Sequence, residues 1–274
     1  MSCGKVEHSA CKCSRAGGRE ELDLKNITNF RKLLLDLHNE ARNNVASGKE
    51  TRGELTSASN MMAVSYSLEL EYFARCYMRN RFTGRLEPGN CRVMSNGRKA
   101  GQCVIGSKGK QTDLSWVKKA FEQWMGQIQY IRKRYIDSYS LPSGGDGENG
   151  DFIEIMWAAV NEIGCARIYA KDIKKLKYIM PYETGLICNY GITISEDQNL
   201  SPNEPGRPVF KRGKPCSECP EFTKCNKEYT SLCGEIAPLP TGPAYDFDNT
   251  SKAMTNKLKR LTLLVVTFSF LVLL

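Results

Sequence analysis

The sequence predicts an α/β fold in which helices sandwich a small antiparallel sheet, followed by a short cysteine-rich module near the C-terminal end. Three stretches in the first half of the chain repeat apolar residues at helical steps, and short β-branched and aromatic stretches follow residue 150. Twelve cysteines, an even number, are spread over the 274 residues. Such a set is typical of an oxidised, extracellular disulfide framework.

Residues 1–25 are polar and cysteine-rich without periodicity, so we expect a loop pinned by disulfides before a main domain at 26–194. The first predicted helix has Thr28 placed to cap its start and Gly48 to end it. Its apolar face comprises Phe30, Leu33, Leu34, Leu37, Ala41 and Val45. The second predicted helix contains Leu68, Leu70, Tyr72, Phe73 and Tyr77.

The third predicted helix has the clearest pattern, because one apolar face continues for about five turns from Val117 to Tyr135. After the glycine-rich loop at 143–150, three short stretches rich in β-branched and aromatic residues predict antiparallel strands. These stretches cover 152–157, 164–170 and 186–194.

Beyond the sheet, the chain divides by composition into a linker at 195–215, a four-cysteine module at 216–235 and a proline-rich stalk at 236–251. The linker is polar and contains proline, so we expect it not to pack. The stalk would hold the domain away from a membrane. Residues 252–274 fit a removed glycosylphosphatidylinositol signal.

In that signal, small residues at the attachment site are followed by a polar spacer and an apolar tail. Asn249 and Ser251 are the predicted attachment residues, and the 14-residue tail from Leu261 is short for a membrane span. Sequons at Asn26, Asn199 and Asn249 agree with export as a glycoprotein. The first residues contain no apolar stretch typical of a signal peptide, so we expect an export signal to be missing from this sequence.

The formal net charge of +9 raises the possibility of a nucleic-acid partner. The basic clusters at 118–119, 132–134 and 171–177 alternate with apolar residues, and no nucleic-acid motif accompanies them. Solvated faces explain such runs, so we expect no nucleic-acid partner and a membrane contact only through the lipid anchor.

The chain resembles the CAP superfamily of cysteine-rich secretory, antigen-five and plant defence proteins, and its insect venom-allergen branch most closely. The motifs that carry the resemblance are Leu37-His-Asn-Glu-Ala-Arg42, Gly150-Asp-Phe-Ile-Glu-Ile-Met-Trp157, Ile163-Gly-Cys-Ala166 and Leu186-Ile-Cys-Asn-Tyr-Gly191. The resemblance covers roughly 3–190 and implies the three-layer α-β-α sandwich of the CAP type. The cysteines from 216 onward resemble the hinge that some members add.

The resemblance also implies where a functional groove lies. Many members carry two histidines and two glutamates there, a set able to hold a divalent metal. The corresponding positions in this chain are Gln102, Gln127 and Asp151, and no histidine lies between the cysteines at 76 and 103. We therefore expect a groove without its metal ligands, and no cofactor. His38, on the first helix, is expected to be a hydrogen-bonded core residue.

Disulfide pairs follow from the same resemblance. Cys165 should pair with Cys188, because the two flank adjacent strands and the family pairs the matching cysteines. Cys91 should pair with Cys11 or Cys13, while Cys216, Cys219, Cys225 and Cys233 should pair among themselves. Cys76 and Cys103 are the remaining expected pair, and the partner of Cys3 stays open. Zinc is the alternative for the cysteines, but only Cys216-Ser-Glu-Cys219 has zinc-like spacing.

The function expected from these features is that of a non-enzymatic, monomeric, extracellular binding protein, acting on a protein or lipid partner through the groove. The alternative is a secreted hydrolase that uses Asp151 and Glu154. Their three-residue spacing on a strand would point the two carboxylates to opposite faces, which favours binding.

Overall fold

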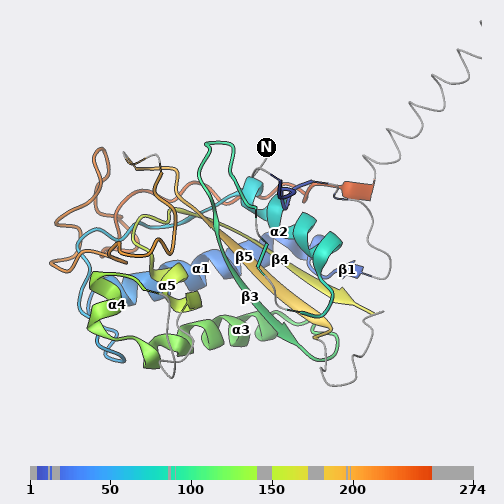
Figure 1. Ribbon diagram of the computed structural model, residues 1–274, viewed down its shortest axis with the longest axis horizontal. Helices are drawn as coiled ribbons and strands as arrows, with labels where there is room; N and C mark the ends of the chain where they lie inside the picture. Colours follow the sequence, from blue (N-terminus) through green and yellow to red (C-terminus); the bar gives the residue numbers. More distant parts are fainter. Residues whose placement is uncertain are drawn as a thin grey trace, which may run out of the picture.

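The computed structural model describes residues 5–11, 13, 19–85, 88–89, 91–140, 150–171, 182–195, 197 and 199–248. In this part of the chain, helices cover both faces of one sheet (Figure 1). Helix α2 (Leu68–Arg81) packs on one face, and α1 (Ile27–Ala46), α3 (Leu114–Gly126) and α5 (Gly150–Met156) pack on the other. The predicted three-layer α-β-α sandwich is therefore confirmed.

The sheet has the strand order β1-β4-β5-β3, and β2 adds a short parallel pair to β4. The strands are β1 (Arg19–Glu21), β2 (Ser65–Tyr66), β3 (Gly101–Ser107), β4 (Glu162–Ala170) and β5 (Thr184–Gly191). The last two match predicted strands, and they pair antiparallel, with Cys165 opposite Cys188. The other three strands were not predicted, and β1 lies within the N-terminal segment expected to be loop.

The first two helices agree with their apolar periodicity. Helix α1 begins one residue after Asn26 rather than at a Thr28 cap, and Gly48 follows its end with a φ of 76°. The third predicted helix is divided into α3, the 3₁₀ helix η2 (Gln127–Tyr130) and α4 (Lys133–Asp137). Its apolar residues stay buried, so the apolar face continues although the helical backbone does not.

The strand predicted at 152–157 is wrong, because helix α5 occupies this position. Phe152, Ile153, Ile155 and Met156 are all completely buried, and the intervening Glu154 is buried as well, so the segment has no exposed face to reveal its period. A short run that is buried on all sides does not distinguish a strand from a helix. The helix also changes which residues of this segment share a side.

The linker predicted at 195–215 packs against the domain, contrary to expectation. Val209 and Phe210 are buried in the main core, and the backbone N–H of Ala158 donates to the Val209 carbonyl at 2.7 Å. The cysteine-rich module also joins the domain, since the Cys233 N–H donates to the Met61 carbonyl at 2.7 Å. The expected separation between the domain and the module is therefore absent from these residues.

The segment expected to be a stalk lies along the domain as far as Asp248 (orange to red in Figure 1). Arg31, in the second turn of α1, donates to the carbonyls of Pro240 and Gly242 at 2.8 and 2.7 Å. Phe247 is buried, with the Arg75 guanidinium 4.9 Å from its ring centroid. These contacts attach the segment to two helices, which is the opposite of a free spacer.

No helix in the described part of the chain is long and apolar enough to cross a membrane. The predicted attachment residues Asn249 and Ser251, the third sequon and the apolar tail lie outside the described residues. The other two sequon asparagines, Asn26 and Asn199, are both exposed.

Candidate functional site

The structure brings two of the three expected groove residues together. Asp151 is the second residue of α5, and Gln127 begins η2, directly after α3. Gln102 lies on β3, but its side chain turns elsewhere: it donates to Asn189 Oδ1 at 2.7 Å and accepts from the Gly89 N–H at 2.7 Å. The groove therefore contains Gln127 and Asp151 as a pair, without the Gln102 amide.

Gln127 holds the start of α5 through both ends of its amide. Its oxygen accepts from the backbone N–H groups of Asp151 and Phe152, at 3.0 and 3.1 Å. Its nitrogen donates to Asp151 Oδ2 at 2.8 Å. Because two backbone donors require an acceptor, the orientation of the amide is determined by its partners. The Asp151 carboxylate is consequently held in one position.

Glu154 lies one turn further along α5 and is only 4% exposed. Burial raises the pKa of its carboxyl from 4.5 to about 8, against the attraction of Arg92, and the charge of Asp151 adds to the rise. Its Oε1 has no hydrogen-bond partner among the described residues. A Cβ on Gly101 would overlap this oxygen, so the glycine is needed to admit the carboxyl beneath β3.

The helical backbone corrects the expected geometry of the two carboxyl groups. Residues three apart on a strand face opposite sides, whereas on a helix they lie on the same side. Asp151 and Glu154 therefore share a side of α5 and influence each other electrostatically. They differ in exposure, since Asp151 is partly exposed and Glu154 is buried.

A buried polar chain behind the groove was only partly foreseen. His38 Nδ1 lies 2.7 Å from the Leu34 carbonyl, so this nitrogen donates, and Nε2 accepts from the Tyr190 hydroxyl at 3.0 Å. Burial lowers the pKa of His38 to about 4, which keeps the ring neutral. The expectation of a hydrogen-bonded core histidine is confirmed.

Tyr190 continues this polar chain to Cys103, a buried cysteine outside any disulfide. The Cys103 thiol also lies 3.6 Å from the Asp151 carbonyl oxygen. Burial, followed by the charges of Asp151 and Glu154, raises the pKa of this thiol well above its usual range. A thiolate nucleophile is disfavoured in this position, because the thiolate is the reactive form.

The groove itself has a volume of about 450 Å³. One wall is β3, which contributes Val104 and Ile105, and the other is formed by the end of α3 and by η2. Tyr130 is 39% exposed on this second wall, and Asp151 contributes the carboxylate. No lysine or arginine is among the described residues that line it. Glu154 and Gln102 are also absent from that lining.

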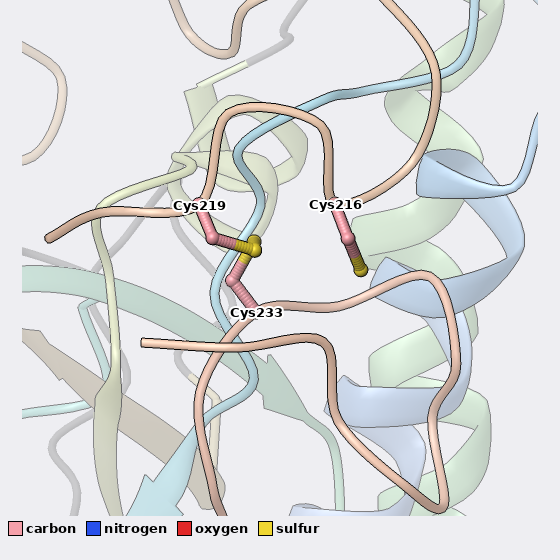
Figure 2. A group of neighbouring side chains, drawn as sticks. All are labelled: Cys216, Cys219 and Cys233. Carbon is pink, nitrogen blue, oxygen red and sulfur yellow. A yellow bond between two sulfur atoms is a disulfide. The ribbon is translucent and has the colours of Figure 1, made fainter. Parts of the chain in front are cut away.

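These residues do not fit the metal implied by the family groove. Asp151 is the one carboxylate among the described lining residues, and the Gln127 amide is occupied by α5. Among the described residues, the group that could gather three metal-ligand atoms is Cys216, Cys219 and Cys233. Figure 2 shows that two of these sulfurs are joined. The pairs are Cys219–Cys233 and Cys216–Cys225, so disulfides account for this group.

The disulfides agree with most of the expected pairing. Cys165 is joined to Cys188, and the four cysteines of the module pair among themselves. The pairing expected for Cys91 is wrong, because Cys13 is joined to Cys76 and Cys11 is a free, exposed cysteine. The expected pair of Cys76 with Cys103 is also wrong, and Cys103 is a free, buried cysteine. Cys91 is disulfide-bonded, with neither Cys11 nor Cys13 as its partner. Helix α2 carries Cys76, which brings it within reach of the N-terminal segment.

Comparisons with known proteins agree with this geometry. Residues 35–190, more than half of the chain, match the model of the cysteine-rich secretory protein family, CAP. A cysteine-rich venom protein of Tityus serrulatus is 30% identical over 235 residues, covering 84% of this chain and 50% of that protein. Venom allergen-1 of Aedes aegypti is 26% identical over 238 residues, covering 84% of each chain.

A solved structure, NaASP2 with Zn²⁺, has a TM-score of 0.53 and 21% sequence identity, covering 81% of this chain and 100% of that one. At this identity, the similarity shows the fold alone. This chain spans about half the length of the Tityus serrulatus protein, so the similarity does not extend over that whole protein. The family match and the sandwich agree, and the chain belongs to the CAP family of cysteine-rich secretory proteins.

Proposed function

We propose that this chain is a non-enzymatic extracellular binding protein that receives a protein or lipid partner in the groove beside Asp151 and Gln127. The observation that carries the proposal is the Gln127 amide, which binds the start of α5 through both its oxygen and its nitrogen. The groove then offers a carboxylate among amide, aromatic and aliphatic side chains. Such a lining suits recognition of a ligand rather than bond cleavage.

The extracellular setting is supported by the venom proteins among the relatives and by the disulfides. We include glycosylation at Asn26 and Asn199, lipid attachment at Asn249 or Ser251, and a monomeric state in this proposal. Because 236–248 packs on the domain, an anchor directly after Asp248 would hold the domain close to a membrane rather than away from it.

The alternative function, a hydrolase using Asp151 and Glu154, has one observation in its favour. The two groups share a side of α5, and burial raises the pKa of Glu154 above that of an ordinary carboxyl. A pair of carboxyl groups with different pKa values is found in enzymes that use one as acid and the other as base. A general acid must reach its substrate, however. Glu154 is 4% exposed and is not among the groove's lining residues, so the geometry favours binding.

The test compares binding with turnover. N-phenyl-1-naphthylamine, a neutral fluorescent probe of apolar sites, should bind the oxidised full chain with 1:1 stoichiometry. Ile105→Arg, in the groove wall, should remove this binding, whereas Glu122→Gln on the exposed side of α3 should keep it. Ester, peptide or glycoside turnover that is lost in Glu154→Gln would favour the hydrolase. Stoichiometric zinc bound at the groove would overturn the proposal.

A further inference from the structure

The groove carries a charge that is opposite in sign to the protein as a whole. The chain has a formal net charge of +9, yet Asp151 is the one charged side chain among the described lining residues. At physiological ionic strength, charges more than about 8 Å away are largely screened. The local carboxylate, and not the net charge, therefore determines which ligand charge the groove attracts.

Asp151 is also the acidic member of its polar cluster that reaches the groove. Glu154 behind it has a pKa of about 8, and burial keeps the Cys103 thiol protonated. The neighbouring Gln127 is neutral and donates one hydrogen bond to Oδ2. The carboxylate is held in a fixed position by this amide, so a cationic ligand would meet a preorganised partner.

The walls on either side of the carboxylate are apolar and aromatic. Ile105 is half-buried on the face of β3 that faces α3, and Tyr130 is exposed opposite it on η2. The adjacent Val104 side chain points to the other face of the sheet, where it packs against α2. An aromatic face beside a carboxylate attracts ammonium groups through both cation–π and ionic interactions. The groove volume of about 450 Å³ is roughly three times that of a cavity that accommodates benzene, about 150 Å³. There is room for an aromatic ring together with a short chain.

From this arrangement, we propose that the groove binds a small organic amine, with its ammonium group at Asp151 and its apolar body between Tyr130 and the β3 wall. This inference rests on the proposed function, because it assigns a ligand class to the same groove. The amide side chains Gln123 and Gln129 at the groove's edge would allow hydrogen bonds to polar groups on the ligand.

Isothermal titration of the oxidised full chain with 2-phenylethylamine and 2-phenylethanol tests the proposal, because the two probes differ chiefly in charge. The amine should bind with 1:1 stoichiometry and about tenfold more tightly than the alcohol, a ratio that corresponds to about 1.4 kcal/mol. Asp151→Asn should remove this preference while keeping binding of the alcohol. Glu122→Gln, which removes one exposed carboxylate from α3, should leave the preference unchanged.

Tyr130→Ala provides a second readout, because loss of the aromatic wall should weaken both probes rather than the amine alone. Equal binding of amine and alcohol by the unmodified protein, or an amine preference that survives in Asp151→Asn, would overturn the inference. Displacement of the amine by one equivalent of Zn²⁺ would assign the carboxylate to a metal instead. If N-phenyl-1-naphthylamine binds but the protein does not prefer 2-phenylethylamine to 2-phenylethanol, only this inference fails. If none of the three probes binds, the proposed function fails as well.

Discussion

Replacing Glu154 by glutamine should stabilise the protein in mildly alkaline solution. In the folded protein this carboxyl is buried, and its pKa is raised to about 8 from 4.5. A raised pKa means that the native state keeps a proton which the unfolded chain has released. The stabilisation from the neutral carboxyl is complete below about pH 4.5 and is lost as the pH rises through 8.

The size of the effect follows from the pKa difference. Each pH unit in which only the native state is protonated changes the free energy of unfolding by about 1.36 kcal/mol. Between pH 6.5 and 8 the loss should therefore be about 2 kcal/mol in the unmodified protein. Glu154→Gln has nearly the same shape and no charge, so this part of its pH dependence should be flat.

Urea unfolding followed by tryptophan fluorescence at pH 6.5, 7.2 and 8 measures the difference, with the disulfides kept intact. Burial also raises the pKa of Glu162, but this residue is present in both proteins. Subtracting the free energies of unfolding of the two proteins at each pH therefore isolates the contribution of Glu154. His38 provides an internal check: its lowered pKa of about 4 predicts that both proteins lose stability as the pH falls below about 6.5. Equal alkaline slopes in the two proteins would refute a buried, neutral Glu154.

Three further predictions concern other parts of the molecule. Arg42 donates six hydrogen bonds to backbone carbonyls, namely those of Met62, Ile155, Trp157, Ala158 and Val160. Arg42→Met should therefore lower the free energy of unfolding by at least about 5 kcal/mol and prevent accumulation of folded protein. The control Arg52→Met, at an exposed position, should not. Maleimide should label Cys11 in the native protein and Cys103 only after denaturation, as peptide mass spectrometry would show; native labelling of Cys103 would contradict its burial. Phe222 is 98% exposed at a φ of 65°, where a bulky side chain is strained, so Phe222→Gly should leave the melting temperature unchanged or raise it, and a clear decrease would indicate a contact made by the ring.

The residues behind the groove show why the sequence predicts some features and misses others. Asp151 and Gln127 were identified from motifs, and the structure places them in contact. Gln102 was identified in the same way, yet its amide binds Asn189 and Gly89, because a strand position does not determine which way a long side chain turns. Cys103 is a free cysteine rather than the expected partner of Cys76, and its neighbours Tyr190 and Asp151 are distant from it in the sequence.

The C-terminal segment shows the same limit at a larger scale. Its prolines and polar residues are typical of a free stalk, but Arg31 and Arg75 bind it to the domain. The sequence of a segment indicates its local conformational preferences. It does not indicate which distant part of the chain will provide a hydrogen-bond donor or a cation–π contact to that segment. The disulfide of Cys13 with Cys76 was missed for the same reason, because its two ends are 63 residues apart.

The sequence by itself determined the helices and strands of the sandwich, and its resemblance to the CAP family supplied the pairing of Cys165 with Cys188. Both depend on local periodicity or on residue identity within a motif, and these are properties of the sequence that do not depend on tertiary contacts. Only the tertiary structure decided that 150–156 is a helix and that Glu154 is buried and neutral, because both depend on surrounding residues. A buried carboxyl acquires its pKa from the water it loses and the charges it meets, and both are properties of the assembled fold.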